Sequence, residues 1–360
     1  MGNAGVNAGP KEIPENITRN LFEFKYIIGK GGFGKVWKVQ VKKTKQKFAM
    51  KEMCKLRIVT KRSVHSVLNE KKLLSVLKHP FIVNMQYAFQ DRENLFLVMD
   101  LMTGGDLRYH LGNMRFFDEE QTRFFVACIV TGLEYLHINH IIHRDIKPEN
   151  LVLDNKGYLR ITDFGIARVL SGDNSRDTSG TPGYMAPEVM CRQNHGIGVD
   201  YFALGVLVYE FMTGRRPWRG RNRKEIKDSI LGRQVQLKRS DIPEGWSIEA
   251  ADFVNKLLQR KPQNRLGFNG ALEVKNHAWL ADFPWKRLFE KALEAPYKPS
   301  EDENFEVKVN ADWKDDLECS LRMSSIQEYF KEYYFDRRKK VTKEDQSTVM
   351  VRQNRPQSPI

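Results

Sequence analysis

The chain has 360 residues, of which 41% are hydrophobic and 29% charged, and it carries a formal net charge of +14. This composition predicts a folded globular protein, and no apolar run approaches the roughly 18 residues of a membrane-spanning helix. The four cysteines are scattered without a CxxC pair, which argues against structural zinc and disulfides. Lysines and arginines occur in separate clusters, so a solvated basic surface is a better interpretation than a nucleic-acid-binding motif.

Residues 1–23 are expected to be a flexible segment, since Gly, Asn and Pro are frequent there. Between residues 24 and 102, short apolar segments alternate with turns, which predicts strands. Among them, SVHSVLNEKKLLSVL has apolar residues at helical spacing and predicts an amphipathic helix. MTGGD interrupts the strand pattern, so we place a boundary there between a small lobe at 24–102 and a large lobe at 103–280.

The large lobe is predicted to be mainly helical. Asp118 and Gln121 form a capping-box pattern that predicts the start of a long helix. VDYFALGVLVYEFMTG is apolar almost throughout and predicts a buried helix that is too short to span a bilayer. Residues 281–345 predict a polar tail that wraps a finished domain, and residues 346–360 predict a disordered end.

Two segments in the small lobe point to nucleotide phosphates. GKGGFGKV places Gly29, Gly31 and Gly34 between two strands, where glycine lets backbone N–H groups approach phosphate oxygens. A strand follows this loop, which argues against a dinucleotide-binding site, where a helix should follow. Lys51 ends the apolar strand FAMK and needs a partner if buried, which Glu70 on the predicted helix can supply.

HRDIKPEN and ITDFGIA, in the large lobe, contain the residues of the general template for phosphoryl transfer. Asp145 can orient the incoming hydroxyl and accept its proton, and Lys147 can neutralise the transferring phosphate. Asn150 and Asp163 offer the oxygen ligands that Mg²⁺ prefers. Each motif alone could be a solvated turn. The ordered set of GxGxxG, AxK, Glu, HRDxKxxN, DFG and APE is not explained that way.

From Phe24 to Leu280 the sequence resembles the protein kinase superfamily, and HRDIKPEN is similar to the serine/threonine kinases. LNEKKLLSVLKHPFIV, GTPGYMAPE and KALEAPYKPSEDENF resemble the AGC group, and LMTGGDLRYHL is similar to its YANK subgroup. The resemblance implies an α+β, bilobal fold, with a small antiparallel sheet lobe plus one helix and a larger, mainly helical lobe. It also implies an enzyme that phosphorylates Ser and Thr with ATP and Mg²⁺.

The resemblance implies a set of ATP-binding residues spread over both lobes. These are Gly29, Lys30, Gly31, Gly32, Phe33, Gly34, Val36, Ala49, Lys51, Met99, Asp100, Met102, Asp106, Glu149, Asn150, Val152 and Asp163. Met99 would be the gatekeeper, and the backbone at Asp100 and Met102 would bond the edge of adenine. The catalytic residues would be Lys51, Glu70, Asp145 and Lys147.

Structural roles are also implied by the resemblance. An apolar stack that marks the active state would contain Leu74, Met85, His143 and Phe164. Asp200 would anchor that stack, and Glu188 of the APE motif would pair with Arg265 in a structural salt bridge.

Substrate choice follows from three acidic positions in the resemblance, Asp106, Glu149 and Glu210. They predict protein substrates with Arg or Lys two and three residues before the Ser or Thr. Alternatively, Glu149 and Glu210 are purely structural. We expect a cytoplasmic monomer that does not bind nucleic acid.

The activation segment departs from the AGC pattern, because Asp177 stands where a phosphorylated threonine is usual. Arg144 and Arg168 match the cations that grip that phosphate. We therefore expect Asp177 to order the segment by a permanent charge, and Thr178 is the alternative phosphorylation site.

Both ends of the chain carry a further pattern. FKEYYF, residues 330–335, resembles the AGC hydrophobic motif with Tyr334 in place of a Ser or Thr, and predicts docking beside the Glu70 helix. The alternative is an exposed aromatic cluster. Gly2 matches part of an N-myristoylation motif, but Val6 stands where Ser or Thr is required. Membrane association is expected only if Gly2 is acylated.

Three other classes of function remain as alternatives. A pseudokinase scaffold would lack a catalytic residue, whereas Lys51, Glu70, Asp145, Asn150 and Asp163 are all present. A kinase-like enzyme acting on a small molecule or lipid usually lacks the peptide-binding segment that GTPGYMAPE supplies. A nucleic-acid-binding protein would show binding that weakens steeply with salt.

Overall fold

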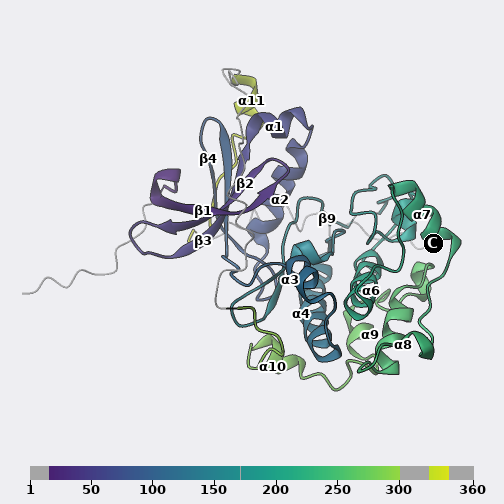
Figure 1. The fold of residues 1–360 in the computed structure, drawn as a ribbon. Coiled ribbons are helices and arrows are strands. Elements are labelled where there is room, and N and C mark those ends of the chain that lie inside the picture. Colours follow the sequence, from purple (N-terminus) through teal and green to yellow (C-terminus); the bar gives the residue numbers. More distant parts are fainter. Residues whose placement is uncertain (1–15, 171, 301–323, 340–360) are drawn as a thin grey trace, which may run out of the picture. The chain divides into compact units, whose positions relative to one another are not determined.

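The computed structural model describes residues 16–170, 172–300 and 324–339, and these residues fall into two compact units. The first unit contains residues up to Leu77, then Asn84–Leu101 and the described part of the tail. The second contains Lys78–Val83 and the chain from Met102 onward, up to the tail. The predictions for Gly2 and for residues 346–360 lie outside the described residues. Figure 1 traces both units.

The first unit is built on an antiparallel sheet of six strands in the order β1-β2-β3-β5-β4-β10. Its strands are β1 (Phe22–Gly31), β2 (Gly34–Val41), β3 (Lys47–Cys54), β4 (Met85–Gln90), β5 (Asn94–Met99) and β10 (Phe335–Asp336). Gly34 is required where β2 meets β3, because a Cβ atom there would lie 1.9 Å from the carbonyl oxygen of Glu52. The glycine therefore allows the glycine-rich hairpin to close against β3.

The helices of the first unit are η1 (Arg19–Leu21), α1 (Lys55–Thr60), α2 (Val64–Val76) and α11 (Ser324–Glu328). The α+β class is confirmed, and α2 is the helix that the sequence predicted. Short α1 and α11 add to that prediction, which gave this unit one helix. Their five or six residues give too little periodic pattern to recognise in a sequence.

The aromatic motif of the tail is docked on the first unit rather than exposed. Phe330 is fully buried and Tyr333 is 1% exposed, whereas Tyr334 is 39% exposed. β10 pairs antiparallel with β4, with Phe335 opposite Ala88. The structure therefore favours the predicted docking over the exposed aromatic cluster.

Two cations, the buried Lys55 and the half-buried Arg337, attach the tail to the helices and strands beneath it. Lys55, at the start of α1, donates from Nζ to the carbonyl oxygen of Asp91 at 2.7 Å and to Oε1 of Gln327 at 2.6 Å. Arg337 donates to the carbonyl oxygens of Leu74 and Leu77, each at 3.1 Å. Carbonyl groups at the end of a helix have no partner within the helix, so Arg337 closes the C-terminus of α2.

The second unit is mainly helical, with two small antiparallel ribbons. The ribbons join β6 (Ile141–Ile142) to β9 (Arg168–Val169) and β7 (Leu151–Leu153) to β8 (Leu159–Ile161). Its α-helices are α3 (Leu107–Met114), α4 (Glu119–Ile138), α5 (Pro187–Met190), α6 (Gly198–Thr213), α7 (Arg223–Gly232), α8 (Ile248–Leu257), α9 (Ala271–Lys275) and α10 (Trp285–Phe289). Three 3-10 turns complete it, η2 (Pro148–Asn150), η3 (Arg239–Asp241) and η4 (Pro262–Asn264).

Helices α4 and α6 form the core of the second unit, as Figure 1 shows. α4 begins at the predicted capping box, where the carboxylate of Asp118 accepts from the backbone N–H of Gln121 at 2.8 Å. α6 is buried along most of its length, and Gly205 lets Leu257 of α8 come close to its backbone. Among the helices of the described residues, none is long and apolar enough to cross a bilayer.

The docked tail makes a prediction about stability. Replacing the fully buried Phe330 by Ala should lower the free energy of unfolding by about 3–5 kcal/mol, because the lost ring leaves a cavity. Urea denaturation measures this change. Tyr329→Ala is the matched control, since Tyr329 is 56% exposed and should change stability little. Equal stability of the Phe330 variant and the wild type would show that the tail does not dock in solution.

Candidate functional site

Lys51 and Glu70 meet within the first unit. Lys51 lies on β3, opposite Val36 of β2, and Glu70 lies on the buried side of α2. The ammonium of Lys51 is 2.9 and 3.0 Å from the two carboxylate oxygens of Glu70. Because Glu70 is almost fully buried, a charge-assisted pair of this kind fixes both side chains.

The glycine-rich segment is the hairpin between β1 and β2, in which Gly31 pairs with Gly34. Gly32 and Phe33 form its tip. A Cβ atom on Gly32 would have no protein atom within 4 Å, and one on Gly31 would be 3.9 Å from its nearest neighbour. The chain's own packing therefore does not require glycine at these two positions, which fits a backbone that a ligand approaches closely.

Each unit carries a separate part of the predicted nucleotide-binding set. Ala49 and Met99 are paired neighbours on β3 and β5. Asp100, also in the first unit, accepts through its carboxylate from the side chains of Gln86 at 2.7 Å and Asn84 at 3.1 Å. The second unit carries the remainder, Met102, Asp106, Glu149, Asn150, Val152 and Asp163.

The segment HRDIKPEN, residues 143–150, is called the catalytic segment here after its predicted role. It lies in the second unit and is held by the carboxylate of Asp200, at the start of α6. This carboxylate accepts from the backbone N–H of His143 at 3.0 Å and of Arg144 at 2.7 Å, and from Nε2 of His137 at 2.8 Å. Burial by itself raises the pKa of Asp200, but the hydrogen bond and charge of His137 outweigh burial, so the pKa lies below its ordinary value. Arg144 is kept in a left-handed conformation, with a φ of 69°.

Asp145 follows directly and lies at the centre of a network of polar contacts. Its carboxylate accepts from the Thr181 hydroxyl at 2.7 Å and from the Asn150 amide at 3.0 Å, and it is 2.7 Å from the ammonium of Lys147. Lys147 also donates to the Thr181 hydroxyl at 2.9 Å. The carboxylate of Asp145 and the ammonium of Lys147 therefore join the segment HRDIKPEN to the segment GTPGYMAPE.

Asn150 and Asp163 have the donor chemistry of a magnesium site. The amide NH₂ of Asn150 is held by the carbonyl and carboxylate of Asp145, which directs its amide oxygen elsewhere. Asp163 has a φ of 64°, and its carboxylate accepts from the N–H of Gly165 at 3.2 Å. One carboxylate and one amide oxygen suit Mg²⁺, which keeps waters and phosphate oxygens as its other ligands.

The apolar stack that the sequence predicted is divided between the two units. Leu74 and Met85 are buried in the first unit. In the second, the rings of His143 and Phe164 meet edge to face at 5.2 Å between centroids. This contact fixes the ring of His143 beside the DFG segment.

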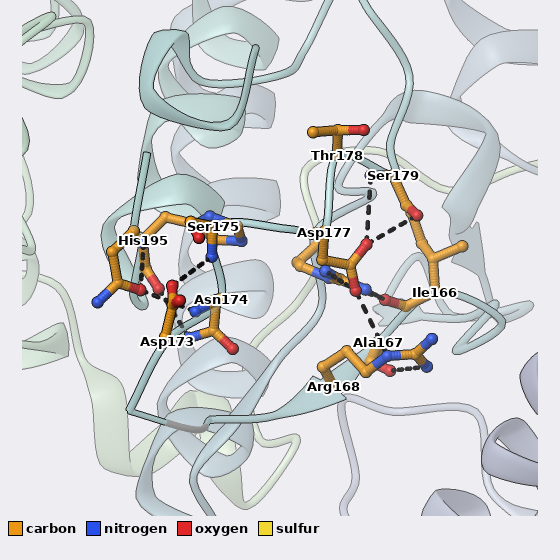
Figure 2. Close-up of polar contacts among 12 residues, drawn as sticks. Ile166, Ala167, Arg168, Asp173, Asn174, Ser175, Asp177, Thr178, Ser179 and His195 are labelled. Atoms are coloured by element: carbon orange, nitrogen blue, oxygen red, sulfur yellow. Dashed lines mark hydrogen bonds and ion pairs between the residues drawn. The ribbon is translucent and has the colours of Figure 1, made fainter. Parts of the chain in front are cut away.

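Asp177 is held by the two arginines that the sequence predicted. Its Oδ2 atom is 2.5 Å from Nη1 of Arg144. The same atom is 3.5 Å from Nε of Arg168, and Oδ1 accepts from the Ser179 hydroxyl at 2.9 Å (Figure 2). Burial alone would raise the pKa of Asp177, but the hydrogen bond and charge of Arg144 outweigh it and lower the pKa. The carboxylate is therefore charged at neutral pH.

The activation segment has a second anchor that sequence reasoning missed (Figure 2). Asn174 donates from its side chain to the carbonyl oxygen of His195 at 3.0 Å, and its backbone N–H donates to the side chain of Asn194 at 2.9 Å. Asn194 and His195 lie 20 and 21 residues after Asn174 in the sequence. Short polar residues in loops carry no pattern that identifies their partner, so the sequence offered no signal.

The three acidic residues predicted to recognise substrate all have partners within the second unit. Asp106 caps α3 by accepting from the backbone N–H of Tyr109 at 2.9 Å. Glu149 and Glu210 both bind Arg108, at 2.9 and 3.0 Å. Sequence reasoning missed Arg108, because 41 and 102 residues separate it from Glu149 and Glu210 and no motif links them.

Glu188 and Arg265 form the expected structural pair. Nη1 and Nη2 of Arg265 are 2.6 and 3.0 Å from the two carboxylate oxygens of Glu188, and both side chains are buried. Nη1 of Arg265 also donates to the carbonyl oxygen of Gly198 at 2.9 Å. This bidentate pair ties α5 to the start of α6.

Comparison with known families matches residues 22–280 to the model described as protein kinase domain. A probable serine/threonine-protein kinase of Dictyostelium discoideum is 38% identical over 335 residues, which cover 91% of this chain and 72% of the relative. The cAMP-dependent protein kinase catalytic subunit of the same organism is 36% identical over 89% of this chain and 50% of the relative. RAC-beta serine/threonine-protein kinase A of Xenopus laevis is 39% identical over 79% of this chain and 58% of the relative.

The Asp200 anchor makes a prediction about pH. Because its folded-state pKa lies below the ordinary value of 3.8, Asp200 contributes its full stability above that value and loses it as pH falls toward the folded pKa. Asp200→Asn should lower the free energy of unfolding at pH 7 by about 1.5–3 kcal/mol, the range for hydrogen bonds to charged groups. Denaturation of both proteins across pH should show this difference narrowing below about pH 4. A difference that stays constant down to pH 3 would contradict the assignment.

Proposed function

This chain belongs to the protein kinase family, and we propose its function on that basis. The protein transfers the γ-phosphoryl group of ATP to Ser and Thr hydroxyls of protein substrates, as a member of the AGC group to which its serine/threonine kinase relatives belong. The observation that carries this proposal is the network around Asp145. Its carboxylate and the Lys147 ammonium converge on one hydroxyl, that of Thr181.

The Thr181 contacts support a specific chemistry for this network. A substrate hydroxyl would be oriented by Asp145, which accepts its proton, while Lys147 neutralises the oxygens of the phosphoryl group in transit. A single carboxylate beside an ammonium provides both functions within about 3 Å of each other. The Thr181 hydroxyl lies between them and keeps both side chains oriented.

ATP and magnesium complete the proposed reaction. Asn150 and Asp163 would hold the metal through their oxygens, and Lys51, fixed by Glu70, would bind phosphate oxygens. Bound magnesium would supply positive charge that stabilises the developing negative charge on the transferring group. A pseudokinase scaffold is a weaker proposal, because Lys51, Glu70, Asp145, Asn150 and Asp163 are all present.

For substrates, we propose proteins with basic residues before the target hydroxyl. Asp106, Glu149 and Glu210 supply three carboxylates in the second unit, and opposite charge is the chemistry that selects Arg or Lys. Glu149 is 44% exposed, so a peptide can reach it.

For activation, we propose that Asp177 orders the activation segment without phosphorylation. Arg144 belongs to the catalytic segment and Arg168 to β9, so one carboxylate links both to the activation segment. Phosphate would bring about 1.5 to 2 units of negative charge, and aspartate brings one that is always present. Thr178 is the alternative regulatory position.

The catalytic role of Asp145 makes a kinetic prediction. Asp145→Asn should lower kcat for peptide phosphorylation by about 10²- to 10⁴-fold, the usual contribution of a positioned general base. The assay measures transfer of radiolabelled phosphate from ATP with Mg²⁺. Asp228→Asn, on an exposed position of α7, is the control and should retain wild-type activity. Full activity of the Asp145 variant would refute the proposed mechanism.

The Asp177 proposal makes a separate prediction. Wild-type protein treated with a phosphatase should keep its activity, whereas Asp177→Asn should lose at least about tenfold, because a charge-assisted hydrogen bond contributes about 1.5–3 kcal/mol. Asp173→Asn is the matched control, since Asp173 is an exposed carboxylate of the same segment. If phosphatase treatment abolishes activity, phosphorylation at Thr178 or elsewhere is the switch instead.

A further inference from the structure

Arg108 occupies the acidic pair that was expected to receive a substrate arginine. Its Nε atom is 2.9 Å from Oε1 of Glu149, and its Nη1 atom is 3.0 Å from Oε1 of Glu210. Its Nη2 atom is 2.5 Å from the hydroxyl of Tyr184 and 3.5 Å from Oε2 of Glu210. All three nitrogens of one guanidinium therefore contact this group of side chains.

The carboxylate of Glu210 is occupied on both oxygens. Oε1 accepts from Arg108, and Oε2 accepts from the hydroxyl of Tyr184 as well as lying near Nη2 of Arg108. Burial and the neighbouring charge of Glu210 raise the pKa of Tyr184, so its hydroxyl keeps its proton and remains a donor. A guanidinium from another molecule would therefore meet Arg108 and Tyr184 already bonded to both oxygens of Glu210 while this arrangement holds.

The position of Arg108 is set by rigid parts of the second unit. It lies in the first turn of α3, which Asp106 caps, and Glu210 lies on the buried helix α6, where it is 7% exposed. Arg108 itself is 36% exposed and Glu149 is 44% exposed. Arg108 thus bridges two acidic residues, the buried Glu210 and the solvent-accessible Glu149.

We propose that Arg108 is a specificity-determining residue that competes, within the same chain, with a substrate arginine for Glu149 and Glu210. This inference rests on the proposed function and deepens it. The two carboxylates and the guanidinium sum to one negative charge rather than two. A substrate arginine must either displace Arg108 or bind the remaining side of Glu149 next to a like charge.

Displacement of Arg108 is costly, because it moves a guanidinium away from the buried charge of Glu210. The incoming arginine restores a similar set of contacts, so the exchange gains little. Selectivity for arginine at this point of the substrate is therefore weaker than the three acidic residues alone would produce. Peptides without an arginine there remain substrates, since Glu210 keeps a partner in their absence.

The test compares four peptides that carry Arg or Ala at the second and third positions before a single Ser. For each enzyme, kcat/KM is measured with Mg²⁺ and ATP. The value for each arginine peptide is divided by the value for the all-alanine peptide. The variants are Arg108→Ala, which removes the guanidinium from Glu149 and Glu210, and Arg108→Lys, which keeps the positive charge without the planar guanidinium. Arg219→Ala removes an equal charge from an exposed position of the same unit and is the control.

We expect the wild type and Arg219→Ala to share one ratio at each position. In Arg108→Ala, the ratio should rise at least about tenfold at one position or both, as two charge-assisted contacts become available, and Arg108→Lys should give a smaller rise. Unchanged ratios in both Arg108 variants, with the all-alanine peptide still phosphorylated, would overturn the inference and leave the kinase function intact. If the wild type phosphorylates no peptide or protein at all, the proposed function fails and this inference fails with it.

Discussion

The buried carboxylate of Asp200 is the constraint on which the catalytic segment of this protein depends. It accepts hydrogen bonds from two consecutive backbone N–H groups, those of His143 and Arg144, and from the imidazole of His137. Consecutive N–H groups can point to one acceptor only where the backbone turns sharply, which explains the left-handed conformation of Arg144. The cost of that conformation is offset by hydrogen bonds to a charged, fully buried acceptor.

The contacts of two neighbouring residues, Arg144 and Asp145, follow from this single turn. It directs the side chain of Arg144 toward Asp177, while the carboxylate of Asp145 meets Thr181 and Lys147. The same segment thus contacts the activation segment and carries the proposed reacting groups. The anchor lies on α6, which is buried along most of its length, so the segment is attached to a core helix of the second unit.

The sequence predicted the pairs whose members belong to recognisable motifs. Lys51 with Glu70 and the Asp118 capping box could be named from the residues of their motifs, and Glu188 with Arg265 because the family resemblance implies that pair. The contact between Arg108 and Glu210 could not, since 102 residues separate them and the helix of Arg108 gives no sign of which strands or helices it faces. Short β10 was missed for the same reason, because two residues form no pattern and their pairing with β4 depends on packing.

Placing β10 along β4 has a consequence for how the protein behaves in a crowded solution. β4 would otherwise be the outermost strand of its sheet, with backbone N–H and C=O groups available to another chain. The tail covers part of this edge, and Gln90 at the end of β4 donates to the backbone of Phe330. A protease that removed the tail would uncover a strand edge as well as the apolar side chains that Phe330 covers, so the shortened chain would be prone to strand-to-strand self-association.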